Sequence, residues 1–143
     1  MGALKTMVDM LDPQDVAYDV VVGVSIGGMN AGMFATFQKG DEKRAVKKMY
    51  EVWQSNPANT MWENWPTLGP VEGLWRSGLV DNTHLADAIG ALVDGNHFKR
   101  MIAIQSVDLN TGDIVIFDET TPTDQTKAAI LSSASIPVIF PVV

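Results

Sequence analysis

One serine between two glycines, at the end of an apolar run, constrains the fold more than any other feature of the chain. Residues 18–22 are rich in valine and show no regular polar alternation, which predicts a short buried strand. The sequence G-V-S-I-G follows at 23–27, and residues 27–38 then have the small and bulky apolar residues of a helix. A strand, a tight turn and a helix in immediate succession are typical of an α/β fold.

Apolar spacing and breaker residues divide the rest of the chain into further elements. We expect a helix before residue 13, helices at 41–55, 84–93 and 123–136, and strands at 101–108 and 114–117. The polar turn between the two strands contains Gly112, which predicts a hairpin. Residues 56–78 hold three prolines and three of the four tryptophans, so we expect an irregular segment that covers the core. This alternation predicts one α/β domain over residues 1–143 with a mostly parallel sheet.

Charge and composition exclude several kinds of partner. The formal net charge of −7 argues against nucleic acid, and the absence of cysteine removes disulfides and thiolate metal sites. The sequence has no cluster of histidines and carboxylates that would suggest a metal site, so we expect neither a metal nor a cofactor. No stretch approaches the roughly 18 apolar residues of a membrane span, and the N-terminus lacks the pattern of a signal peptide. We therefore expect a location in the cytoplasm or at the periphery of a membrane, while the oligomeric state is not indicated.

The serine turn is interpreted as a nucleophile elbow made of Gly23, Val24, Ser25, Ile26 and Gly27. Glycines two residues away on either side let the strand and the helix approach each other, and the turn lifts the hydroxyl to a helix N-terminus. The backbone N–H of Ile26 and the helix dipole would then stabilise a developing oxyanion. A merely tight turn and a phosphate cradle are the alternatives, although the chain has no nucleotide-binding glycine motif.

The positions of the histidines argue against a Ser-His-Asp triad. The chain has only His84, in the first turn of an expected helix, and His97, in a polar turn. In an α/β-hydrolase the histidine follows the acid late in the chain, and neither residue fits that place. We expect Ser25 to be activated in another way.

Three segments resemble the patatin-like phospholipase family. Residues 18–35 (YDVVVGVSIGGMNAGMFA) are similar to its nucleophile segment, 107–119 (VDLNTGDIVIFDE) to its central strand pair, and 128–143 (AAILSSASIPVIFPVV) to its Ile-Pro-x-x-Phe-Pro signature. The resemblance implies a three-layer α/β sandwich and a lipid acyl hydrolase of the phospholipase A or lipase type, acting on a lipid or phospholipid. It also implies a Ser-Asp dyad without histidine, with Ser25 as the nucleophile.

Two motifs of that family are not found in the chain. Its glycine-rich oxyanion loop stands upstream of the helix that begins here near Gly2, and its dyad aspartate stands in an Asp-Gly-Gly or Asp-Gly-Ala motif beyond the signature. Asp108, Asp113 and Asp118 are expected to be solvated hairpin residues instead of the base. We therefore expect a truncated domain with little activity by itself, since losing one oxyanion donor alone costs about 10²–10³ in rate.

Two other functions stay open at this point. One is a non-catalytic truncated product that binds lipid or a protein partner, and the other is a complete hydrolase or transacylase with a different base. Peripheral contact with a membrane is a further expectation, because Trp62, Trp65 and Trp75 would border a lipid-accessible mouth unless they simply pack. A basic helix face at 43–48 would attract anionic headgroups weakly, or it is only solvated.

Overall fold

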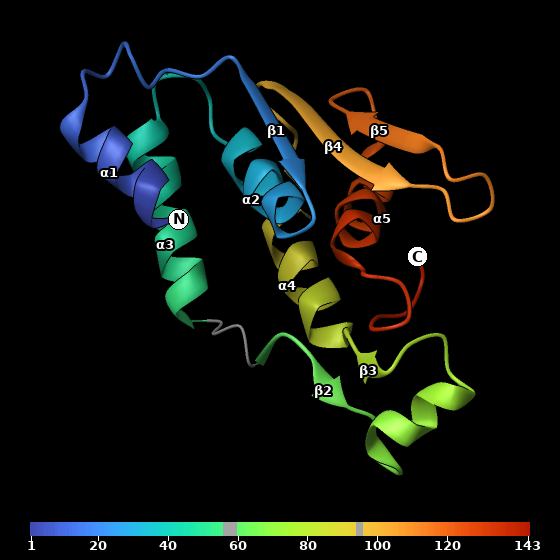
Figure 1. The fold of residues 1–143 in the computed structure, drawn as a ribbon. Helices are drawn as coiled ribbons and strands as arrows, with labels where there is room; N and C mark the ends of the chain where they lie inside the picture. Colours follow the sequence, from blue (N-terminus) through green and yellow to red (C-terminus); the bar gives the residue numbers. More distant parts are fainter. Residues whose placement is uncertain (56–59, 94–95) are drawn as a thin grey trace.

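The serine turn joins the first strand to the second helix of the molecule. In the computed structural model, which describes residues 1–55, 60–93 and 96–143, β1 (Val20–Val24) ends one residue before Ser25 and α2 (Ile26–Ala35) begins one residue after it (Figure 1). The strand expected at 18–22 therefore lies two residues further along the chain. It extends to Val24 because pairing with the neighbouring strand continues up to the turn.

Three strands form the main sheet in the order β1-β4-β5, with β4 at Met101–Val107 and β5 at Ile114–Asp118. β1 runs parallel to β4, with Val24 opposite Gln105. β4 and β5 form the expected antiparallel hairpin, in which Ala103 lies opposite Asp118. The described sheet therefore has one parallel and one antiparallel pairing.

The two faces of this sheet have different surroundings. Ile102 and Ile104 point to the inner face and are buried where α2 and α5 (Thr123–Ala134) pack on the sheet. The outer face carries exposed apolar side chains: Val20, Val22, Val24, Met101, Val107, Ile114 and Ile116. The expectation that the first strand is buried on both faces is wrong for the described residues, because a run of valines gives no sign of which face is covered.

The remaining helices extend the inner layer away from the sheet (Figure 1). α4 (Thr83–Val93) packs against α5 and α2, α3 (Glu42–Ser55) packs against α2, and α1 (Gly2–Met10) packs against α3. α5 ends two residues earlier than expected, since Ser135 is already extended ahead of Pro137. The fold is α/β, as expected, and within the described ranges no helix is both long and apolar enough to cross a membrane.

The irregular segment that the sequence predicts covers one end of the helical layer. Its residues 56–59 lie outside the described part, and the rest holds β2 (Glu63–Asn64), a 3₁₀ helix η2 (Gly69–Leu74) and β3 (Val80–Asp81), with β2 and β3 paired antiparallel. The backbone N–H groups of Leu79 and Val80 donate to the carbonyls of Val138 and Ile139, at 2.9 and 3.1 Å. The C-terminal residues are thereby held against this segment.

A buried ion pair fixes the entry to β4. Arg100 donates from Nη1 to Glu42 Oε1 at 3.0 Å and to the Tyr18 carbonyl at 2.9 Å, and from Nε to the Phe37 carbonyl at 2.9 Å. Its guanidinium also lies 4.6 Å from the ring centroid of Phe34. The two charged side chains are only 2% and 4% exposed, so each supplies the counter-charge of the other.

Candidate active site

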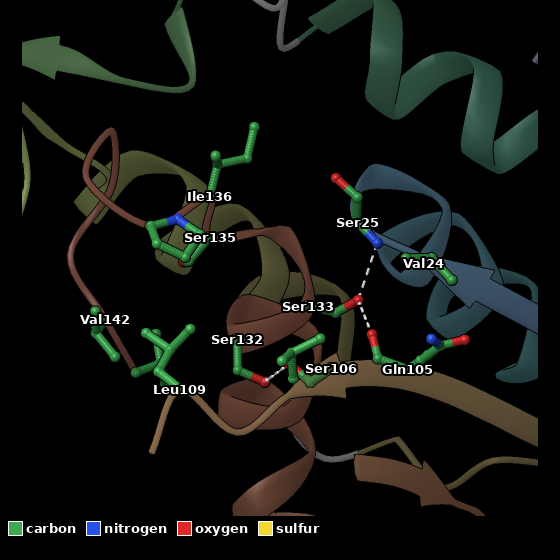
Figure 2. Close-up of a pocket in the computed structure, with 13 residues that line it drawn as sticks. Val24, Ser25, Gln105, Ser106, Leu109, Ser132, Ser133, Ser135, Ile136 and Val142 are labelled. Carbon is green, nitrogen blue, oxygen red and sulfur yellow. Dashed lines mark hydrogen bonds between the residues drawn. The ribbon is translucent and has the colours of Figure 1, made fainter. Parts of the chain in front are cut away.

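Ser25 has a backbone conformation that L-residues rarely adopt. Its φ is 57° and its ψ is −132°, and the only other described non-glycine residue with a positive φ is Val138. Such a conformation costs about 1–3 kcal/mol and persists only where the surroundings enforce it, most often at functional sites. Figure 2 shows the Ser25 hydroxyl pointing away from Gln105 and Ser133. The side chain is half-buried and lines two cavities.

The steric argument for the two elbow glycines holds at one of them. A Cβ on Gly23 would lie 2.1 Å from the carbonyl oxygen of Gly27 and 2.6 Å from the amide nitrogen of Gly28, so no side chain fits there. A Cβ on Gly27 would meet nothing within 4 Å. Gly28, which the sequence reasoning did not single out, is more crowded than Gly27. A Cβ on Gly28 would lie 3.2 Å from a side-chain carbon of Ile104 and 3.3 Å from Ser133 Oγ.

Hydrogen bonds that involve the Ser25 backbone and the Ser133 hydroxyl hold the elbow in place (Figure 2). The amide of Ser25 donates to Ser133 Oγ at 2.9 Å, and that hydroxyl donates to the carbonyl of Gln105 at 2.6 Å. The Gly28 amide donates to the Ser25 carbonyl at 2.8 Å, which closes the turn into α2. Ile26 is the first residue of α2, so its backbone N–H has no partner inside the helix and is placed to meet an anion.

A cavity of about 230 Å³ lies on one side of Ser25, next to the ends of β4 and α5 (Figure 2). We call it the polar cavity because it is lined by several serines, although seven of its thirteen lining residues are apolar. Its polar lining consists of Ser25, Gln105, Ser106, Ser132, Ser133 and Ser135. Ser132 Oγ and Ser106 Oγ lie 3.0 Å apart, and Ser135 Oγ accepts a hydrogen bond of 3.3 Å from Asn82 Nδ2. The hydroxyls thus have neutral partners.

An apolar cavity of about 460 Å³ lies on the other side of Ser25. Trp53 forms one wall, and its indole Nε1 donates to Asn30 Oδ1 of α2 at 2.8 Å. Trp62 forms another wall and packs edge-on against Phe140, with ring centroids 6.0 Å apart.

Of the three tryptophans expected at a lipid-accessible mouth, only Trp62 lines this cavity. Trp65 instead donates from Nε1 to the Gly78 carbonyl at 2.9 Å and lies under the guanidinium of Arg76. Trp75 is 68% exposed and lines neither cavity at Ser25. Trp53 of α3 lines the cavity although the sequence analysis did not single it out.

None of the ionisable residues that the structure describes lines either cavity at Ser25. His84 is exposed, with Nε2 3.3 Å from Glu63 Oε1, and His97 lies at the surface. Asp108 accepts the amide of Asn110 within the hairpin. None of these three residues lines a cavity at Ser25.

Two further aspartates are held in their charged form by local donors. The Thr120 hydroxyl and amide donate to Asp118, and this lowers the pKa of that carboxyl. Asp81 adjoins Val80 of the apolar cavity, and the Thr83 hydroxyl lowers its pKa in the same way. A carboxylate with a lowered pKa and two donors is a weak proton acceptor. Across the described residues, no group of three histidine or carboxylate side chains is placed to hold a metal ion.

The chain is an α/β protein in which a strained serine stands between a strand and a helix and lines an apolar cavity. This arrangement is typical of the class of serine acyl hydrolases. The family model of the patatin-like phospholipases matches residues 1–143, and the chain belongs to that family. A search of curated proteins found none that matches. The resemblance noted in three segments of the sequence is thereby confirmed, and the family is one of lipid acyl hydrolases.

Proposed function

We propose that the chain is a lipid acyl hydrolase in which Ser25 is the nucleophile. The observation that carries the proposal is the strained backbone of Ser25 at the junction of the apolar and the polar cavity. Ser25 Oγ attacks the carbonyl carbon of an ester while its proton passes to an aspartate, the base that the family resemblance implies. The resulting oxyanion is stabilised by the backbone N–H of Ile26 at the start of α2.

The two cavities suit the two halves of such a substrate. The apolar cavity takes the acyl chain, since each buried CH₂ contributes about 0.8 kcal/mol. The polar cavity takes the alcohol, which leaves with the proton that the aspartate received from Ser25. Water then attacks the serine ester and releases the fatty acid, which restores the hydroxyl.

The activity of the chain by itself is proposed to be low. Among the described residues, neither cavity at Ser25 is lined by a carboxylate that takes up the serine proton, and the oxyanion donor that we identify is the Ile26 amide. The same observation supports a second candidate function, in which the chain binds a lipid acyl chain in the apolar cavity without hydrolysing it.

An alkyl fluorophosphonate is expected to label the chain slowly and only through Ser25, because the phosphonyl group reacts with an exposed nucleophilic hydroxyl. Ser25→Ala should abolish the adduct in intact-mass spectrometry. Ser77→Ala removes an exposed serine that lines neither cavity and should label like the unaltered chain. Equal labelling of Ser25→Ala would contradict the proposal, whereas a folded chain that resists the probe but binds a fatty acid supports the second candidate.

Trp62→Ala is expected to weaken the binding of a fluorescent long-chain fatty acid about tenfold, because a bound chain loses roughly 1–2 kcal/mol of apolar contact. Trp75→Ala is the matched control, since both tryptophans are partly exposed, at 42% and 68%, and only Trp62 lines the cavity. Fluorescence titration gives the two Kd values, and thermal unfolding checks that both variants are folded. Equal Kd values for the two variants would rule out the apolar cavity as the acyl site.

A further inference from the structure

The Ser133 hydroxyl contacts the backbone of the proposed nucleophile from a distant part of the chain. Ser133 lies in the last turn of α5, and 108 positions of sequence separate it from Ser25. Its Oγ accepts the Ser25 amide at 2.9 Å and donates to the Gln105 carbonyl at 2.6 Å (Figure 2). A serine hydroxyl has a single proton, so the bond to Gln105 turns its lone pairs toward the Ser25 amide.

The partners of Ser133 are the parts of the fold that define the elbow. Gln105 lies opposite Val24, the last residue of β1, so the hydroxyl joins the end of this strand pair to the turn. Gly28 leaves the space that the hydroxyl needs, because a Cβ there would lie 3.3 Å from Ser133 Oγ. The contact is therefore built by three elements: β4, α5 and the start of α2.

The strained conformation of Ser25 requires such a contact. A positive φ at a residue with a side chain relaxes toward ordinary values unless neighbouring groups hold it. The angle φ describes rotation about the bond between the Ser25 amide nitrogen and its Cα, so a hydrogen bond from that amide restrains it. The side-chain acceptor of this amide in the described structure is Ser133 Oγ. If the acceptor is lost, the turn can rotate and carry the Ser25 hydroxyl away from the junction of the two cavities.

We propose that Ser133 is a positioning residue, whose hydroxyl holds the Ser25 backbone in the conformation that presents the nucleophile. The inference rests on the proposed role of Ser25. Ser133 does not take up the serine proton, because its own proton is donated to Gln105 and the Ser25 side chain points away from it (Figure 2).

The neighbouring serine provides a matched comparison. Ser132 lies on the same turn of α5, is also half-buried and also lines the polar cavity. Its hydroxyl lies 3.0 Å from Ser106 Oγ and donates to the Ala129 carbonyl at 2.9 Å, so neither of these bonds reaches the elbow. Loss of either hydroxyl removes two hydrogen bonds from the same helix end, and only one of these losses releases Ser25.

The test compares Ser133→Ala with Ser132→Ala in the 143-residue chain, and adds Ser133→Thr and Ser133→Val. Threonine and valine have the same shape but only threonine keeps the hydroxyl, so this pair decides the matter if the alanine variant does not fold. Two readouts are used: the second-order rate constant for fluorophosphonate labelling of Ser25, and hydrogen exchange of the Ser25 amide measured by NMR.

We expect Ser133→Ala and Ser133→Val to label roughly a hundredfold more slowly, the order of loss that a displacement of about 1 Å causes at a reacting atom. In both variants the Ser25 amide should lose its protection. Ser133→Thr should keep most of both, and Ser132→Ala should keep the protection of the Ser25 amide. Protection of that amide in Ser133→Ala equal to that in Ser132→Ala would overturn the inference, as would a threonine variant as slow as the valine one. If Ser25 is not labelled in any chain, the proposed function fails, while amide exchange still decides whether Ser133 holds the turn.

Discussion

Gly23→Ala is expected to abolish fluorophosphonate labelling of Ser25 and to destabilise the chain by about 3 kcal/mol or more, above the usual range for an overpacked core. The new methyl group would lie 2.1 Å from the Gly27 carbonyl oxygen and 2.4 Å from its carbonyl carbon. These are backbone atoms of the first turn of α2, so the helix must move away from β1. The nucleophile would move with it.

Gly27→Ala is the matched control for that change. The position is helical and an added Cβ meets nothing within 4 Å, so alanine should raise the free energy of unfolding by about 0.5–1 kcal/mol through its better helix propensity. Labelling of Ser25 should persist. Urea unfolding and intact-mass spectrometry measure both effects. If the two alanine variants behave alike, the close approach of strand and helix at Gly23 is not what shapes the turn.

Arg100→Met is expected to lower the free energy of unfolding by about 3–5 kcal/mol, because it leaves the Glu42 carboxylate buried without a counter-charge. The Tyr18 and Phe37 carbonyls also lose their donor. Replacing Glu42 by methionine in the same chain should recover part of the loss, since the uncompensated charge is then gone. Urea unfolding at neutral pH gives the three values.

An exposed ion pair of the same chain serves as the comparison. Lys39 and Asp19 are paired at the surface, with side chains 48% and 64% exposed, so Lys39→Met should cost no more than about 1 kcal/mol. A similar cost for Lys39→Met and Arg100→Met would mean that burial adds nothing to the pair at the start of β4.

The elements around the serine turn follow from local sequence, and so they were predictable. The valine run before Gly23 indicates the strand, and the small residues after Ser25 indicate the helix that follows it. The hairpin is equally local: Gly112 has a φ of 79°, a value that favours glycine in a tight turn. The phospholipase motif was also visible, because it is a contiguous stretch.

The contacts that complete the candidate site are distant in sequence, and local patterns do not show them. Ser133 reaches Ser25 across 108 positions, and Trp53 reaches Asn30 across 23. The covered face of β1 was missed for a related reason, since both faces of that strand carry valine and the packing of α2 on one of them is what distinguishes them. Spacing likewise made both elbow glycines look equally constrained, whereas the local backbone path crowds Gly23 alone.

Ile136 belongs to the walls of both cavities at Ser25. It directly follows the C-cap of α5, and the chain just beyond it is held by the amides of Leu79 and Val80. A larger side chain at this position would therefore narrow both cavities, and a smaller one would widen both. In the proposed reaction, one substitution at Ile136 would change the choice of acyl chain and of alcohol in the same direction.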